Sequence, residues 1–469
     1  MKNITVDVAV IGAGTAGLAA YRAARARGAR ALVIEEGPYG TTCARVGCMP
    51  SKLLIAAAEA AHAIDDAPGV GVYVDGAKRV DGREVMARVR SERDRFVGFV
   101  LEGVERIPAS DRIAGKARFV DRNTLEVGGH TRVSARAIVI ATGSRPAIPA
   151  MLQGAGDRLV VNDDVFSWDT LPRSVAVFGP GVIGLEIGQA LARLGVRVVV
   201  LGRGGRVGPL ADPVVRESFL KSISPELYLD PDAHVKRVAR ITDGVEVEYT
   251  RLDGAVRTES FDYVLAATGR RPNVDGLGLE TLSLELDAAG VPRFDPATLR
   301  VGDTSLFIAG DASNFIPLLH EAADEGRIAG DNAARLPAVE PGKRRMPLAV
   351  VFTDPQIAIV GGGYERLAPG TFEAGEVSFE DQGRARVMRR NRGHLRVYAD
   401  RATGRFLGAE MAGPSAEHIG HLLAWAAANR MTVAAMLEMP FYHPVVEEGL
   451  RTALRDLDAK LHKPQAIAA

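Results

Sequence analysis

Two stretches of the sequence decide the fold, "VAVIGAGTAGLAA" at residues 8–20 and "VAVFGPGVIGLEI" at residues 175–187. Each reads as a buried strand, a glycine turn and the opening of a helix. Each contains the pattern GxGxxG, which is weak evidence when it occurs once, because any tight strand-to-helix turn favours glycine. Two motifs in this context predict two dinucleotide sites, since glycine lets a pyrophosphate approach the free amides of the helix N-terminus. The six glycines are Gly12, Gly14, Gly17, Gly179, Gly181 and Gly184.

A second pair of related segments supports a repeated nucleotide-binding plan. "AIVIATGSRP" at residues 137–146 and "YVLAATGRRPN" at residues 263–273 are both strands that end in Ala-Thr-Gly and a basic turn. From residue 346 the pattern changes to alternating strands and an Ala- and Met-rich segment, which predicts a separate α+β domain. We expect one helix over residues 415–439, and we expect its Met431, Met436 and Met439 side chains to fill the hydrophobic core of this domain.

Length and composition indicate a globular protein of several domains. The 469 residues are 47% hydrophobic and 25% charged, which fits two to four domains. Lys plus Arg and Asp plus Glu both number 58, so the basic charge of a general nucleic-acid binder is missing. No apolar run approaches the ~20 residues of a membrane span or forms a secretory signal. We therefore expect a cytoplasmic protein with neither nucleic acid nor membrane as its partner.

One position distinguishes the two nucleotide sites. A carboxylate that binds an adenosine ribose lies about 20 residues beyond the glycine turn. Glu35 occupies this place in the first unit, whereas Gly202 occupies the same offset in the second and Arg203 follows it. A missing carboxylate and a guanidinium from Arg203 or Arg206 favour the 2′-phosphate of NADP. The alternative is that these arginines lie in a solvated loop and NAD binds without the carboxylate.

The chain has only two cysteines, Cys43 and Cys48, five residues apart in "TTCARVGCMPSK" at residues 41–52. In a reducing compartment a close pair indicates redox chemistry or metal binding. Metal is the weaker choice, because two thiols are half of a four-cysteine zinc site and no His pair lies nearby at ligand spacing. We expect no metal.

This stretch resembles the redox-active CxxxxC segment of the FAD-dependent pyridine nucleotide-disulfide oxidoreductases, which include dihydrolipoyl dehydrogenase, glutathione reductase and mercuric reductase. Both glycine motifs, both ATG turns, "AGDAS" at 309–313 and "FYHPVVEEGL" at 441–450 follow in the family's order. The resemblance implies an α/β fold with two Rossmann-like, glutathione-reductase-type domains and a C-terminal α+β dimerisation domain. The implied division is FAD domain 1–150, NAD(P) domain 151–270, a central segment 271–345 that completes the FAD domain, and interface domain 346–469.

The resemblance also implies roles for individual residues. Glu35 would bind the FAD ribose, Asp311 would reach the ribityl-phosphate region, and Glu186 would lie near the nicotinamide. The FAD set is Gly12, Gly14, Gly17, Glu35, Thr42, Lys52, Thr142, Gly143 and Asp311. The NAD(P) set is Gly179, Gly181, Gly184, Glu186, Arg203 and Gly269.

Four residues would carry the catalysis that the resemblance implies. His443, oriented by Glu448, would deprotonate a substrate thiol, whose thiolate attacks Cys43. The substrate then closes its own disulfide, and Cys48 faces the flavin on the way to NAD(P)+. A base is needed because the thiolate, not the thiol, attacks a disulfide, and His titrates near neutral pH. In the family the His comes from the partner subunit, so a homodimer is expected.

The substrate remains open between several readings. "CMPSK" resembles dihydrolipoyl dehydrogenases, so a small dithiol or a lipoyl-carrying protein is the expected substrate. The absence of a third Cys disfavours mercuric reductase and the large thioredoxin reductases, which need a further thiol or selenol pair. An NADPH-dependent reductase of another small disulfide, similar to glutathione reductase, is the alternative. A redox-inert FAD-binding structural protein is the alternative of another class. The basic run at 383–396 either docks an acidic carrier domain or is a solvated face.

The spacing of the cysteines makes a further demand on the backbone. In a regular helix, residues five apart lie roughly 8 to 9 Å apart at Cα, which is beyond the reach of an unstrained disulfide. A bridge therefore requires "ARVG" to leave the helical conformation. Gly47 permits this, and Pro50 assists because it lacks an amide proton.

Overall fold

The computed structural model describes residues 1–463 and has an α/β fold that divides into two compact units. The first unit comprises residues 1–53, 87–147 and 269–345, and the second comprises 54–86, 148–268 and 346 onward. The remaining residues of the expected interface domain, 464–469, lie outside the described part. Among residues 1–463, none of the helices combines the length and apolar character that a membrane crossing requires.

A mixed sheet of seven strands organises the first unit. Its order is β3-β2-β1-β6-β5-β4, with β17 also paired to β6. The strands are β1 (Lys2–Ile11), β2 (Ala31–Glu35), β3 (Arg112–Ala114), β4 (Ala117–Asp121), β5 (Thr124–Val127), β6 (Thr131–Ile140) and β17 (Leu306–Ile308). β1 runs parallel to β2 and β6, with Val10 opposite Val33 and Val139. β17 joins the same sheet although it follows about 170 residues after β6 in the chain, so the two segments form one core.

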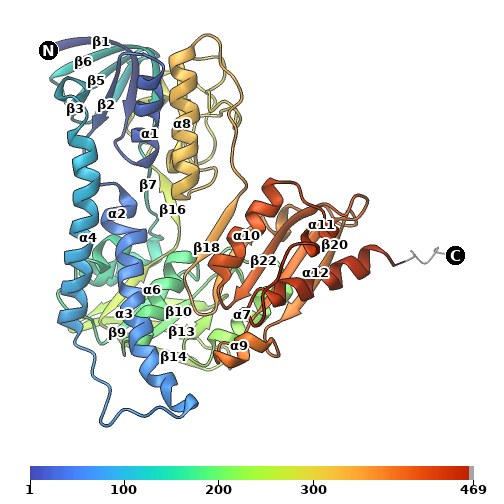
Figure 1. The fold of residues 1–469 in the computed structure, drawn as a ribbon. Coiled ribbons are helices and arrows are strands. Elements are labelled where there is room, and N and C mark those ends of the chain that lie inside the picture. Colours follow the sequence, from blue (N-terminus) through green and yellow to red (C-terminus); the bar gives the residue numbers. More distant parts are fainter. Residues whose placement is uncertain (464–469) are drawn as a thin grey trace. The chain divides into compact units, whose positions relative to one another are not determined.

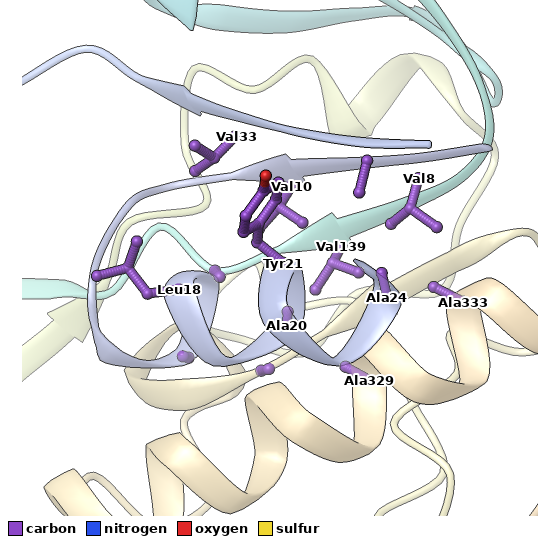
Figure 2. Close-up of a cluster of buried hydrophobic side chains, with 14 of the residues drawn as sticks. Val8, Val10, Leu18, Ala20, Tyr21, Ala24, Val33, Val139, Ala329 and Ala333 are labelled. Atoms are coloured by element: carbon purple, nitrogen blue, oxygen red, sulfur yellow. The ribbon is translucent and has the colours of Figure 1, made fainter. Parts of the chain in front are cut away.

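Two helices cover one face of this sheet, α1 (Thr15–Ala26) and α8 (Leu319–Arg335) (Figure 1). Figure 2 shows Val8, Val10, Val33 and Val139 of the strands packed against Leu18, Ala20, Tyr21 and Ala24 of α1, with Ala329 and Ala333 of α8 beside them. The Tyr21 hydroxyl donates to Asp111 at 2.8 Å, and burial together with this bond raises the pKa of Tyr21 to about 12. The polar end of this buried aromatic side chain is therefore satisfied.

Glycines make the close approach of α8 to α1 possible. A Cβ at Gly326 would lie 2.1 Å from the carbonyl oxygen of Ala16, and one at Gly330 would lie 2.1 Å from that of Ala20. No side chain fits in either place, so the separation of the two helices is set by backbone contact.

The remaining elements of the first unit are shorter or continue into the second. They are α2 (Thr42–Val46), α3 (Cys48–Asp66), α4 (Gly82–Glu105), the paired strands β7 (Ser144–Pro146) and β16 (Arg270–Pro272), and a 3-10 turn, η5 (Gly310–Ser313).

The second unit begins with a parallel sheet of order β11-β10-β9-β15-β8. Its strands are β8 (Leu159–Val160), β9 (Ser174–Phe178), β10 (Arg197–Leu201), β11 (Tyr228–Asp230) and β15 (Tyr263–Ala266), and its helices are α5 (Asn162–Val165), α6 (Val182–Arg193) and α7 (Pro213–Ile223). The same unit also has a separate antiparallel sheet of β12 (His234–Ile241), β13 (Gly244–Thr250) and β14 (Val256–Phe261). The strand–turn–helix of the first unit, β1 to α1, therefore recurs here as β9 to α6.

An antiparallel five-stranded sheet of order β18-β19-β22-β21-β20 completes the second unit. Its strands are β18 (Leu348–Val351), β19 (Gln356–Val360), β20 (Phe372–Ser378), β21 (His394–Asp400) and β22 (Phe406–Gly413), and its helices are α9 (Gly383–Val387), α10 (Ala416–Ala428), α11 (Val433–Leu437) and α12 (Glu448–Leu461). This antiparallel sheet with helices is the α+β arrangement expected from residue 346.

The single helix expected over residues 415–439 is wrong. It is two helices, α10 and α11, because Arg430 adopts a positive φ of 53° that ends the first one. Met436 is buried as expected and Met431 is partly buried, but Met439 is 49% exposed and does not belong to the core.

Candidate active site

The first glycine turn has the geometry of a pyrophosphate cradle. A Cβ on Gly12 would lie 2.3 Å from the Ala141 carbonyl oxygen, and one on Gly17 would lie 1.9 Å from that of Gly12. These two glycines are required by the packing of the turn. At Gly14, in contrast, an added Cβ would meet no atom within 4 Å, and no side chain caps the helix that starts there. The free amides of α1 therefore face open space, which fits an anionic ligand.

The second glycine turn repeats this geometry. Gly179 has the same φ as Gly12, 103°, and its Cβ would lie 2.4 Å from the Ala267 carbonyl oxygen. A Cβ on Gly184 would lie 2.0 Å from the Gly179 carbonyl oxygen, whereas one on Gly181 would meet nothing within 4 Å. The start of α6 also lacks a side-chain cap. In both turns, therefore, the second glycine of the motif leaves open space beside an uncapped helix start, as a bound dinucleotide requires.

Glu35 lies at the end of β2 and its carboxylate faces the first glycine turn. Its Oε2 accepts from the Ala13 amide at 2.7 Å and its Oε1 from the Gly37 amide at 2.9 Å. A carboxylate has about four acceptor sites, so it can still accept from ribose hydroxyls. This position is compatible with the expected contact between Glu35 and the FAD ribose.

Three further members of the FAD set lie on turns of the first unit. The Thr142 hydroxyl donates to the Asn273 carbonyl oxygen at 2.6 Å, and the backbone amide of Asn273 donates to the Gly143 carbonyl oxygen at 2.9 Å, so the two Ala-Thr-Gly segments are joined. Asp311, in η5, accepts from the Ser144 hydroxyl at 2.6 Å.

Ser144 and Arg270 are polar partners of this region that the sequence reasoning missed. Arg270 donates to the Ser144 hydroxyl at 2.8 Å and to its carbonyl oxygen at 2.7 Å. Ser144 in turn binds Asp311, so a guanidinium and a hydroxyl fix the carboxylate. The repeated basic turns, "GSRP" and "GRRP", were the available signal.

The two cysteines lie at a break between helices. α2 ends at Val46, Gly47 has φ −125° and ψ −117°, and α3 begins at Cys48. Within "ARVG", Ala44, Arg45 and Val46 stay in α2 and only Gly47 leaves the helical conformation, so the departure that the cysteine spacing required is confined to one residue. Pro50 lies in the first turn of α3, where a missing amide costs nothing.

The break brings the Cys43 and Cys48 side chains into hydrogen-bond contact as free thiols. This hydrogen bond, with burial of Cys43, raises the pKa of the Cys43 thiol far above its usual range, and the nearby charge of Lys52 opposes the shift only in part. Cys43 thus keeps its proton at neutral pH, and formation of its thiolate needs a base. Thr42, the first residue of α2, is exposed beside the pair.

His443 and Glu448 form a hydrogen-bonded pair at the start of α12. His443 Nδ1 donates to Glu448 Oε2 at 3.0 Å, and Arg451 donates to Oε1 at 2.7 Å. Burial raises the pKa of Glu448, but the bonds from the Val445 amide and His443 outweigh it, so this pKa lies below its usual range. A carboxylate only accepts, so Nδ1 carries the proton and Nε2 is left as the acceptor.

The His443 side chain is 81% exposed and belongs to the second unit, whereas both cysteines belong to the first. Tyr442 beside it is 79% exposed. Both side chains are therefore open to solvent.

The remaining residues expected to bind NAD(P) differ in burial, and they belong to both units. Glu186 on α6 is buried and accepts from the Phe352 amide at 3.0 Å. Arg203 is exposed in the loop after β10, and within residues 1–463 it has no acidic partner. Arg206 lies 3.6 Å from Glu365 in an exposed pair. Gly269 has an open Cβ position but is the first residue of a segment of the other unit, and its part in the site stays a prediction.

Position 202 excludes any side chain. A Cβ there would lie 2.5 Å from the Pro231 carbonyl oxygen and 2.7 Å from Cγ of Pro180. The absence of a carboxylate at this offset is therefore a packing requirement of the loop.

The basic run 383–396 is only partly a solvated face. Arg392 lies 3.2 Å from Glu226 and 3.0 Å from Asp354, and Arg396 lies 2.9 Å from buried Asp212. Those arginines hold the second unit together, which leaves Arg386, Arg389 and Arg390 as the exposed cations. Across the described part of the chain, no group of three or more His, Cys, Asp or Glu side chains could hold a metal ion.

Comparison with known proteins agrees with this geometry. Residues 6–326 match the model of the family described as pyridine nucleotide-disulphide oxidoreductase, and residues 348–454 match that of its dimerisation domain. The chain is 31% identical to mercuric reductase of Shigella flexneri over 96% of its length and 80% of the relative's. It is 32% identical to dihydrolipoyl dehydrogenase 3 of Pseudomonas aeruginosa, over 97% of this chain and 98% of that one. Among solved structures, LpdA of Mycobacterium tuberculosis superposes with a TM-score of 0.81 at 26% identity, covering 97% of this chain and 99% of that chain.

Proposed function

Because the chain belongs to the pyridine nucleotide-disulphide oxidoreductase family, we propose that it is a flavoprotein disulfide oxidoreductase of the dihydrolipoyl dehydrogenase type. It oxidises a small dithiol at Cys43 and Cys48 and uses NAD(P)+ as the final acceptor. The contact between the two thiols at the Gly47 break carries the proposal, since binding a nucleotide requires no such contact.

The chain's own residues account for the proton and thiol steps. In the oxidised protein, which has a Cys43–Cys48 disulfide, His443, held by Glu448, accepts a proton from the substrate thiol at Nε2. The substrate thiolate attacks Sγ of Cys43, forms a mixed disulfide with it and releases Cys48 as the leaving thiolate. The second substrate thiol then attacks the substrate sulfur of this mixed disulfide, closes the substrate disulfide and displaces Cys43, which leaves Cys43 and Cys48 reduced, as they are in this structure. Because the pKa of Cys43 is raised in this pair, the proton stays on the Cys43 sulfur until a base removes it.

The bound groups are held by the residues of the two glycine units. Gly14 and the amides of α1 would bind the FAD pyrophosphate, with Glu35 at the ribose and Asp311 beyond it. FAD, when bound, supplies the two-electron chemistry that connects a dithiol to a nicotinamide. Gly181 and α6 would bind NAD(P), and Arg203 favours the 2′-phosphate of NADP. Lys52, Thr42 and Glu186 keep their expected roles as part of this proposal.

A homodimer completes the proposed site. Exposed apolar side chains lie on α10 and beyond α11 in the part that matches the dimerisation domain. They are Leu422, Trp425, Met439 and Tyr442, with Trp425 66% exposed. A second copy of the chain covers them and brings its His443 to these cysteines.

The class of substrate distinguishes the two candidate functions, dithiol oxidation and disulfide reduction. Relatives of similar identity bear the names mercuric reductase and dihydrolipoyl dehydrogenase, and this chain has no thiol beyond Cys48. A dithiol that fits between two subunits, such as a lipoyl group, is favoured. A small disulfide reduced with NADPH is the second candidate, favoured by Arg203.

Steady-state assays test the proposal. We expect turnover of dihydrolipoamide with NAD(P)+, its loss in Cys43→Ser and Cys48→Ser, and little activity toward glutathione disulfide with NADPH. The reverse preference would select the second candidate. Anaerobic two-electron reduction should produce a long-wavelength thiolate-to-flavin band, and a protein that lacks both the band and turnover would be redox-inert.

A further inference from the structure

The loop that follows β10 contains a carboxylate from a distant part of the sequence. Asp232 lies just after β11, and its Oδ1 accepts from the Gly204 amide at 2.6 Å. This bond places an anionic side chain in the loop that carries Arg203, 30 residues beyond the ribose offset. Sequence spacing alone does not identify Asp232, because this residue follows the neighbouring strand, β11, and reaches the loop only through the tertiary fold.

The surrounding backbone fixes this arrangement. The Gly202 amide donates to the Asp230 carbonyl oxygen at 2.7 Å, the Gly205 amide to that of Pro231 at 3.1 Å, and the Ala233 amide to that of Gly202 at 3.1 Å. Gly204 and Gly205 both have positive φ, 76° and 72°, which lets the loop close on the Asp232 turn. The loop and the turn therefore present one joined surface.

Asp232 is exposed and has acceptor capacity to spare. Within the described residues 1–463, its Oδ2 atom has no hydrogen-bond partner. Position 202 itself cannot carry a carboxylate, since a Cβ there would collide with Pro180 and Pro231. Asp232 is thus the exposed carboxylate of the turn that contacts this loop, whereas its neighbour Asp230 is buried and accepts from the Asp232 amide at 3.0 Å.

We propose that Asp232 takes the place of the carboxylate missing at position 202 and sets the dinucleotide selectivity. This proposal rests on the proposed function. The Asp232 carboxylate accepts hydrogen bonds from the ribose hydroxyls of NAD(H), and its negative charge repels the 2′-phosphate of NADP(H). Arg203 acts in the opposite direction. The loop therefore holds both an NAD-type acceptor and an NADP-type cation, and the enzyme uses both dinucleotides.

Asp232→Asn tests the charge separately from the loop structure, because the amide oxygen still accepts from Gly204. Rapid mixing measures the reduction of FAD by NADH and by NADPH. We expect the NADPH-to-NADH ratio of kcat/KM to rise about tenfold, a change of about 1.4 kcal/mol in relative transition-state binding. Titration calorimetry with adenosine 2′,5′-bisphosphate should show tighter binding by a similar factor. Asp232→Ser keeps the acceptor with a smaller group and should act in the same direction.

The matched control is Asp253→Asn. Asp253 is also exposed and accepts a turn amide, that of Ala255 at 2.9 Å, on the turn between β13 and β14. The NADPH-to-NADH ratio of kcat/KM in Asp253→Asn should stay at the wild-type value. An unchanged ratio in both Asp232 variants, or equal shifts in Asp253→Asn, would overturn the proposal. Wild-type FAD that neither dinucleotide reduces would instead overturn the proposed function, while the bisphosphate titration would still test Asp232.

Discussion

At the scale of single residues, the two glycine turns separate glycines that the fold needs from glycines that a ligand needs. Gly12 and Gly179 face backbone atoms, whereas Gly14 and Gly181 face open space. A substitution at the second pair therefore reports on ligand binding without disturbing the protein.

We expect Gly14→Ala to fold normally and to lose FAD, because the added methyl group occupies the space beside the α1 amides. Gly181→Ala should keep FAD and raise KM for NAD(P)H about tenfold. The ratio of flavin to protein absorbance and steady-state kinetics measure the two effects. If Gly14→Ala retains full FAD and Gly181→Ala retains its KM, the assignment of both cradles is wrong.

The His443–Glu448 pair predicts a division between the half-reactions. His443→Gln should slow dithiol oxidation about 10²- to 10⁴-fold, the usual contribution of a general base. Glu448→Gln should have a smaller effect, because it orients His443 without taking the proton. Reduction of FAD by NAD(P)H should be unchanged in both. Equal losses in the two half-reactions would show a structural defect and not a missing base.

At the scale of elements, backbone contact between α1 and α8 joins distant segments of the chain. Gly326→Ala should force the helices apart and lower the free energy of unfolding by about 1–3 kcal/mol, with some loss of FAD. Gly98→Ala on α4 is the control, since its added Cβ meets nothing within 4 Å, and it should stabilise that helix by up to about 1 kcal/mol. Chemical denaturation measures both, and a neutral Gly326→Ala would contradict the contact.

A buried ion-pair network joins α6 to the segment before β19. Arg193 is 9% exposed and donates to Glu226 at 2.7 Å and to Asp354 at 2.9 Å. Burial opposes ionisation of both carboxyls, but Arg193 and Arg392 override it, so the pKa of each lies below its usual value. The stabilisation is therefore present above the unfolded-state pKa and is lost as the pH falls through the folded-state pKa.

Arg193→Met should consequently lower the free energy of unfolding by about 3 kcal/mol near neutral pH, and the difference from wild type should narrow in acid. Thermal and denaturant unfolding measures it from pH 7 down to pH values below the lowered folded-state pKa of Glu226 and Asp354. Arg386→Met, which breaks an exposed pair with Asp381, should change stability by no more than about 0.5 kcal/mol. A constant difference at all pH values would exclude the electrostatic cause.

The sequence predicts elements better than it predicts neighbours. The strand–turn–helix units, the helix break at Gly47 and the α+β segment from 346 could be read from it, because each depends on local chemistry. The division of residues 415–439 could not, since it depends on a positive φ at Arg430. Asp232 and the Ser144–Arg270 contact were missed because tertiary pairing brings them to their sites.

At the scale of the whole molecule, the proposed dimer makes an experimental prediction. Cys43→Ser should be inactive in dithiol oxidation, and His443→Gln should keep no more than about 1% of wild-type activity. If they are mixed and exchange subunits, half the dimers are mixed and each has one complete site, so about a quarter of wild-type activity should return. Recovery is measured after dissociation and reassociation at equal concentrations. No recovery, with mixed dimers demonstrated by mass, would place the base in the same subunit as the cysteines.

The crowded position 202 also constrains how this lineage can change. In an open loop, one nucleotide substitution that turns glycine into glutamate would install a ribose-binding carboxylate. Here that step meets Pro180 and Pro231 first, so intermediates along the direct mutational path would be poorly folded. Evolution toward strict NAD dependence would have to proceed through the loop or the neighbouring strand, and a laboratory selection for cofactor switching should enrich mutations there before any at Gly202.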